Sequence, residues 1–172
     1  MLFLSTAVVA LFLAVETAVS LRHERALRAR GAVEPPDDVH RWMRMAYPGC
    51  FIAMIVEGLW RGQPPVPVWW AGVALFAASK ALKIWAIHAL GPLWSFRVLV
   101  LPGAPLVTTG PYRRLRHPNY VAVAGELAAV ALMFGAPVAG PVSIVGFGWL
   151  MRRRIAVEEK ALTGRSDIET EK

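Results

Sequence analysis

Cysteine is almost absent from this chain, since Cys50 is the only one in 172 residues. A single cysteine excludes an internal disulfide and a zinc site built from cysteines, and we predict that Cys50 is inert within an apolar segment. The motifs of common soluble enzymes are also missing: there is no glycine-rich dinucleotide fingerprint, no P-loop, no Gly-x-Ser-x-Gly elbow and no His-Glu-x-x-His pair. His23 and His88 have no second ligand at metal spacing, so we predict no metal site.

Charge is scarce as well, because only 18% of the residues are charged, whereas 56% are hydrophobic and the mean hydropathy is +0.45. This composition is typical of an integral membrane protein and leaves little for a soluble domain. The net charge of +7 raises the alternative of nucleic-acid binding. The basic residues, however, lie in short clusters between apolar runs, as expected of loops that face an anionic membrane surface. We therefore predict membrane lipids, and no nucleic acid, as partners.

The apolar runs predict an all-α integral membrane protein with about five transmembrane helices, the last two forming a short helical hairpin. The first run is interpreted as a retained span and not as a signal peptide, because no basic region precedes it and no small-residue cleavage site closes it. The expected spans are residues 1–20, 45–60, 68–90, 120–134 and 138–151.

The distribution of basic residues predicts the orientation of these spans. With five passes, the polar connectors 21–44 and 91–119 share one side with the C-terminal tail and contain nearly every Lys and Arg, whereas Arg61 lies alone on the other side. The positive-inside rule then places the N-terminus outside and the C-terminus in the cytoplasm. Lys80 and Lys83 are expected to extend their side chains towards the cytoplasmic surface.

The most informative segment is residues 110–120, with the sequence GPYRRLRHPNY. Gly110 and Pro111 break the backbone, and Pro118 suits the first turn of a helix, where its missing N–H is not needed. A helix N-terminus combines unpaired backbone N–H groups with the positive end of the helix dipole, and three arginines add charge here. The segment therefore predicts a binding site for an anionic group such as a carboxylate or phosphate.

Arg154 and Glu158 share one face of a helix that continues from the fifth span. A routine surface ion pair is the alternative, but the predicted topology returns this helix to the side of residues 110–120, where the two could close over one ligand. Glu126 lies within the fourth span and needs a partner, because an ionised carboxylate in hydrocarbon is costly. A hydrogen bond between helices and a place in a ligand cavity are equally open for it.

Residues 110–120, followed by Arg154-x-x-x-Glu158-Glu159-x-x-Leu162, resemble the isoprenylcysteine carboxyl methyltransferase (ICMT) family. Its members are small integral-membrane enzymes that use S-adenosylmethionine. The resemblance covers residues 90–163 and implies a cytoplasmic cofactor-binding loop together with a C-terminal helix.

The N-terminal half carries a narrower resemblance. Residues 28–34 (RARGAVE) and His40 are similar to a bacterial subgroup found beside type III polyketide synthases, whose members O-methylate long-chain alkylpyrones or alkylresorcinols. The chain would then consist of a transmembrane region 1–89, the catalytic region 90–163 and a polar tail 164–172, which we expect to be frayed.

The resemblance also implies roles for individual residues. Glu158 would hold the polar end of the cofactor, and Arg154 would face the methyl acceptor as the catalytic residue. Their positions, and not the resemblance, make Trp94 in the connector and Glu126 in the fourth span further candidate substrate-binding residues beside Arg154. The other expected cofactor contacts are Ala104, Pro105, Leu106, Val107, Tyr112, His117, Pro118, Asn119 and Tyr120.

We therefore expect an S-adenosylmethionine-dependent O-methyltransferase in the bacterial inner membrane, acting on a lipophilic acceptor that enters from the bilayer. An alkylpyrone or alkylresorcinol leads, with a functional link to a type III polyketide synthase, and a prenylcysteine carboxylate is the alternative. Two further classes are a reductase resembling sterol reductases, which share an Arg-His-Pro-x-Tyr loop and bind NADPH, and a non-catalytic scaffold. The Arg154 and Glu158 motif and the short chain favour the methyltransferase.

Overall fold

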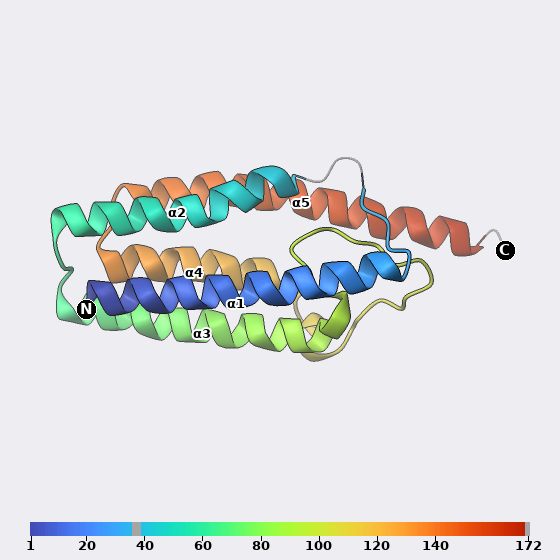
Figure 1. Cartoon of the computed structure of the whole chain (residues 1–172), viewed down its shortest axis with the longest axis horizontal. Coiled ribbons are helices and arrows are strands. Elements are labelled where there is room, and N and C mark those ends of the chain that lie inside the picture. The colour runs from blue at the N-terminus through green and yellow to red at the C-terminus, as the bar shows by residue number, and fades with distance from the viewer. Residues whose placement is uncertain (36–38, 171–172) are drawn as a thin grey trace.

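The computed structural model describes residues 1–35 and 39–170, and for residues 162–170 it describes the backbone alone. Within these ranges the chain forms five long helices that lie side by side, with two 3-10 turns in the connector between the third and the fourth (Figure 1). Apart from one isolated bridge between Val33 and Val100, the described residues form no β-structure, which confirms the all-α prediction. The elements are α1 (Leu2–Ala29), α2 (His40–Arg61), α3 (Val66–Leu90), η1 (Gly91–Leu93), η2 (Gly110–Arg113), α4 (Pro118–Phe134) and α5 (Ala139–Thr170).

Helix α4 lies at the centre of the bundle and contacts the other four long helices. Its residues Leu127, Val130 and Phe134 are completely buried. The closest packing is against α3, where a Cβ atom added to Gly72 would lie 2.7 Å from the side chain of Met133. Small residues at helix interfaces allow such close approach of two backbones, which strengthens dispersion contacts inside a membrane.

Local chemistry explains the two ends of α4. Pro118 is its first residue, as expected, and Gly135 ends it with a φ of +59°, a left-handed conformation that favours glycine. The chain then turns into α5, whose first backbone N–H groups are satisfied by another helix. The Glu57 carboxylate of α2 accepts hydrogen bonds from the N–H groups of Val138 (3.3 Å) and Ala139 (2.6 Å).

Several predicted boundaries are wrong. Helix α1 continues to Ala29 and α2 begins at His40, so most of the expected polar connector 21–44 is helical. The extension of α1 is stable because Ser20, His23 and Glu24 find hydrogen-bond or ionic partners in the connector after α3. Helix α5 continues to Thr170, so the tail that we expected to be frayed is helical that far. Residues 171–172 lie outside the described residues.

All segments predicted to share one side lie at one end of the bundle. Figure 1 shows the end of α1, the long connector before α4 and the C-terminal half of α5 at this end, opposite the N-terminus and the turn between α2 and α3. Among the described residues, two stretches, Leu2–Ala29 and Val66–Leu93, are long and apolar enough to cross a membrane, and Pro118–Phe134 is a shorter apolar helix. Five complete crossings stay a prediction.

The orientation can be tested with single cysteines in a Cys50→Ser background. Gln63 and Thr108 are both exposed and belong to turns predicted to lie on opposite sides. We expect Gln63→Cys to react with an impermeant thiol reagent in intact cells, and Thr108→Cys to react only after the membrane is opened. Labelling of Thr108→Cys alone in intact cells would indicate the opposite orientation, and labelling of both variants would contradict the five-span topology.

Candidate active site

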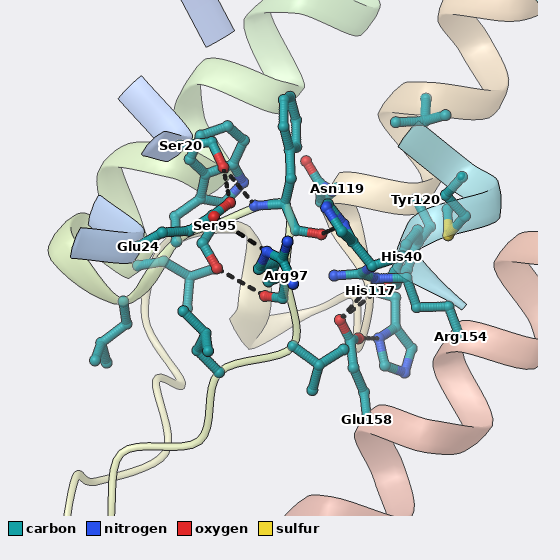
Figure 2. A pocket seen from close by; sticks show the side chains of 18 of the residues that line it. Ser20, Glu24, His40, Ser95, Arg97, His117, Asn119, Tyr120, Arg154 and Glu158 are labelled. Carbon is teal, nitrogen blue, oxygen red and sulfur yellow. Dashed lines mark hydrogen bonds and ion pairs between the residues drawn. The ribbon is translucent and has the colours of Figure 1, made fainter. Parts of the chain in front are cut away.

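A cavity of about 630 Å³ lies at the end of the bundle where the connectors meet. Its wall combines residues of α1 and α2, the end of α3, the connector between α3 and α4, the first turn of α4 and the middle of α5. Segments far apart in the sequence therefore enclose one space, as Figure 2 shows. Its volume falls within the range of about 300–1,000 Å³ that is usual for sites that bind small molecules.

One polar chain in this wall joins α4 to α5. The Nε of Arg154 donates a hydrogen bond to the Tyr120 hydroxyl at 2.8 Å, and that hydroxyl donates to Oε1 of Glu158 at 2.7 Å (Figure 2). Arg154 is only 4% exposed, although it carries a permanent charge. The two sequence motifs, residues 110–120 and the α5 pair, thus meet directly.

The rim of the cavity is also charged. The His117 ring lies 3.7 Å from Glu158 through Nδ1 and 3.4 Å from Glu159 through Nε2. Arg116 is exposed and lies 3.9 Å from Glu159. Burial and, next, the Glu158 carboxylate raise the pKa of the Tyr112 hydroxyl, which therefore stays protonated at neutral pH and can donate a hydrogen bond.

Two buried polar atoms of residues in the wall have no hydrogen-bond partner in the described part of the chain: Oδ1 of Asn119 and Nε1 of Trp94. An unpaired buried donor or acceptor costs about 1–3 kcal/mol. The two atoms are complementary, since the amide oxygen accepts and the indole N–H donates. A bound molecule with one matching donor and one matching acceptor would recover that free energy.

The connector that covers the cavity is fastened to α1 and α2 by its backbone. The N–H of Phe96 donates to Oγ of Ser20 at 2.8 Å, and its carbonyl accepts from Nδ1 of His40 at 3.0 Å. Since a carbonyl can only accept, His40 must carry its proton on Nδ1 in this contact. The neighbouring Trp94 carbonyl lies 2.9 Å from Nδ1 of His23.

Ion pairs reinforce this attachment. Arg97 lies 3.3 Å from Glu24 of α1 and 2.6 Å from Glu34, which also pairs with Arg28 at 2.5 Å. Burial raises the pKa of Glu34, but the hydrogen bonds and charges of Arg28 and Arg97 outweigh this effect and hold the pKa below its usual range. Glu34 therefore stays ionised, and the turn that follows α1 is tied to the connector that lines the cavity.

Most of the expected site residues do lie in the wall of this one cavity. Pro118 and Glu126 do not. Pro118 is buried at the start of α4, and Glu126 lies behind the wall among charged groups. The expected residues found in the wall are Trp94, Ala104, Pro105, Leu106, Val107, Tyr112, His117, Asn119, Tyr120, Arg154 and Glu158.

Glu126 belongs to a buried ion cluster that joins four helices. Its carboxylate lies 3.1 Å from Nζ of Lys80 and 3.2 Å from Nζ of Lys83, and it accepts a hydrogen bond from the Tyr47 hydroxyl. Both lysines also pair with Glu16 of α1, at 2.5 Å and 2.7 Å. The expectation that the lysines reach the membrane surface is therefore wrong: they are 6% and 1% exposed, because two carboxylates hold them inside the bundle.

The sequence pattern of the isoprenylcysteine carboxyl methyltransferase (ICMT) family matches residues 72–164, which is more than half of the chain. The chain belongs to this family. It is 31% identical over 163 residues to the "Uncharacterized protein YpbQ" of Bacillus subtilis (strain 168), and the match covers 94% of this chain and 96% of that protein. An "Uncharacterized protein" of Haemophilus influenzae (strain ATCC 51907 / DSM 11121 / KW20 / Rd) is 25% identical over 146 residues, covering 84% and 85%. No solved structure matches the chain significantly.

The ICMT match divides the cavity in two. The first turn of α4, the middle of α5 and the connector from Gly91 lie within the matched residues. The wall formed by α1 and α2 lies outside them. Residues inside the family match therefore line one half, whereas the other half comes from the N-terminal helices.

Sequence reasoning did not assign the polar residues of this second half to the site, chiefly Ser20, Glu24 and His40, although His40 was part of the narrower resemblance. The hydropathy pattern ended the first helix at Ser20, so Glu24 was assigned to a loop. Two side chains one turn apart on a helix can interact, but a loop assignment predicts no such relation for Ser20 and Glu24. The four-residue spacing of Ser20 and Glu24, whose side chains form a hydrogen bond of 2.8 Å, is the sequence signal that could have revealed this pair.

Proposed function

We propose that this ICMT-family protein is an S-adenosylmethionine-dependent O-methyltransferase of the bacterial inner membrane, with the cofactor entering from the cytoplasm. The observation that carries the proposal is the contact between its two motifs. Tyr120, from residues 110–120, donates to Glu158 at 2.7 Å and accepts from Arg154, so residues 110–120 and the α5 pair face one cavity. Isolated surface ion pairs would not produce this convergence.

The residues present fit the cofactor. The start of α4 has no side-chain cap in the described part of the chain and lies beside three arginines, which suits the carboxylate of the methionine moiety. The unpartnered oxygen of Asn119 can accept from an amino group, and Glu158 can hold a ribose hydroxyl or a cationic amine. The faces of Tyr112 and Tyr120 can stabilise a sulfonium by cation–π attraction.

When bound, the cofactor supplies a methyl group on a sulfonium; the carbon–sulfur bond breaks as an acceptor oxygen forms the new carbon–oxygen bond, and S-adenosylhomocysteine leaves. The chain's own contribution is position and charge. Arg154 cannot act as a base, because its guanidinium stays protonated. Its role is to orient an acceptor oxygen and to stabilise that oxygen in its ionised form, while the proton of a neutral acceptor passes to water.

The acceptor that we propose is a long-chain alkylpyrone or alkylresorcinol, functionally linked to a type III polyketide synthase. Apolar residues of α1, α2 and α5 extend the cavity along the bundle, among them Leu13, Met43 and Phe147, and they suit a hydrocarbon chain that enters from the bilayer. A prenylcysteine carboxylate is the second candidate. It matches the description of the family, and the buried Arg154 suits a carboxylate.

Calorimetry on the detergent-purified protein tests the cofactor. We expect binding of S-adenosylmethionine and S-adenosylhomocysteine, and no binding of NADPH. The reason is that Glu158 contacts Tyr120 of residues 110–120, and these two motifs together carry the resemblance to the methyltransferase family. Incubation with labelled S-adenosylmethionine and a panel of alkylresorcinols, alkylpyrones and prenylcysteines then identifies the acceptor. NADPH binding without S-adenosylmethionine binding would assign the protein to the reductase class instead.

A further inference from the structure

Among the described residues of the cavity wall, Trp94 is the most deeply buried one whose side chain has a polar atom without a hydrogen-bond partner. The residue is 2% exposed, and its Nε1 has no hydrogen-bond partner in the part of the chain that the structure describes. An indole can only donate, so the missing partner must be an acceptor atom. Since no described protein atom supplies it, an oxygen of a bound molecule is the natural candidate.

The surroundings of Trp94 hold its ring in place. Nδ1 of His23 donates to the Trp94 carbonyl at 2.9 Å, and the His23 ring lies edge-on to the indole with centroids 6.3 Å apart. The Phe96 ring also lies 5.3 Å from the indole, and the Phe96 backbone N–H donates to Ser20. The donor is therefore oriented before any ligand binds, which reduces the entropy that binding must overcome.

The position of Trp94 in the cavity indicates which ligand it meets. The cofactor residues proposed above lie on residues 104–120 and on α5, whereas Trp94 contacts His23 of α1. The wall outside the family match is formed by α1 and α2 and includes apolar residues such as Leu13 of α1 and Met43 of α2. Trp94 itself lies within the family match, but its carbonyl and its ring contact His23 of α1. It therefore borders the half of the cavity formed by α1 and α2, in which a lipid acceptor, rather than the cofactor, would lie.

We infer that the Trp94 N–H binds a second oxygen of the acceptor head group, while Arg154 faces the oxygen that is methylated. The inference rests on the proposed methyltransferase function and specifies its substrate class. The acceptor carries two oxygens on one head group, as in a resorcinol, a hydroxypyranone or a carboxylic acid. A long-chain alkylamine without a head-group oxygen does not fit, because its ammonium cannot accept from an indole N–H and is repelled by Arg154.

The test compares Trp94→Phe, which keeps a ring but loses the N–H, with two lipids that differ by one oxygen. 5-Pentadecylresorcinol has two hydroxyl groups and 3-pentadecylphenol has one. We expect Trp94→Phe to raise KM for the resorcinol about tenfold, the equivalent of about 1.4 kcal/mol, and to leave the affinity for S-adenosylhomocysteine within about twofold. Wild type should disfavour the phenol by a similar factor, and Trp94→Phe should no longer distinguish the two lipids.

Trp42→Phe is the matched control, since Trp42 is 69% exposed on α2 and lies outside the cavity wall; it should behave as wild type. If Trp94→Phe weakens both lipids equally, the N–H does not contact the second oxygen and the inference is overturned, although the methyltransferase stands. The same lipids are also titrated by calorimetry with S-adenosylhomocysteine present. A wild-type protein that binds this nucleoside but neither lipid overturns the inference, whereas one that fails to bind the nucleoside contradicts the proposed function itself.

Discussion

Arg154→Lys is expected to lower kcat/KM for the best lipid acceptor about 100-fold while leaving S-adenosylmethionine affinity near that of wild type. Lysine keeps the charge but loses the planar guanidinium, which can grip an ionised oxygen with two hydrogen bonds. A 100-fold loss corresponds to about 2.7 kcal/mol, the usual cost of one well-placed transition-state donor. The measurement is steady-state methyl transfer together with calorimetry of the cofactor.

The neighbouring helix residue provides the control. Arg152 lies on the same helix and is exposed, so Arg152→Lys should leave both measurements unchanged. Glu158→Gln should show the opposite pattern to Arg154→Lys, with weaker cofactor binding and a smaller effect on turnover at saturation. If Arg154→Lys retains full turnover, Arg154 serves only as one of the basic residues that flank a membrane helix.

The link through Tyr120 refines this experiment. Its hydroxyl accepts from Arg154 and donates to Glu158, and these two charged residues also lie 3.6 Å apart directly. Tyr120→Phe removes the bridge and keeps both charges. Double variants that combine Tyr120→Phe with Arg154→Lys or with Glu158→Gln then measure how far the effect of each charged residue depends on the Tyr120 hydroxyl.

The features of the site that could be predicted from the sequence are those that depend on local chemistry. Pro118 marked a helix start, and the spacing of Arg154 and Glu158 placed them on one face; the structure has both features. Charge counting placed the connectors at one end, and the bundle has that arrangement (Figure 1). These signals act over a few residues or over the whole chain, so one sequence is enough to detect them.

Contacts between distant segments could not be predicted in the same way. Glu126 needed a partner on energetic grounds, but nothing in the sequence pointed to Lys80 or Lys83, which are about forty residues earlier. Likewise, Ser20 was placed at the end of the first span and Glu24 in the connector, because hydropathy cannot register that the distant Phe96 N–H donates to Ser20 and that Arg97 pairs with Glu24. Partner choice depends on how the helices pack, and packing emerges only when all five are assembled.

The buried ion cluster leads to the largest expected change in stability. Lys83 contacts Glu16 at 2.7 Å, Glu126 at 3.2 Å and the Tyr47 hydroxyl at 3.3 Å, and it is 1% exposed. With Lys80, the cluster holds two positive and two negative charges, so its formal charge is balanced. Lys83→Met removes one cation and leaves two buried carboxylates with only Lys80 as a counter-ion.

We expect Lys83→Met to destabilise the folded protein by about 3–5 kcal/mol, because an uncompensated buried charge is more costly than no ion pair at all. Denaturant titration in mixed micelles measures this free energy, and Lys160→Met, which alters an exposed lysine of α5, is the control. The decisive comparison is Lys83→Met combined with Glu126→Gln, which restores the charge balance to one lysine and one carboxylate. This double variant should be more stable than Lys83→Met alone; a double variant whose loss equals the sum of the two single losses would mean that the lysine contributes by packing and not by its charge.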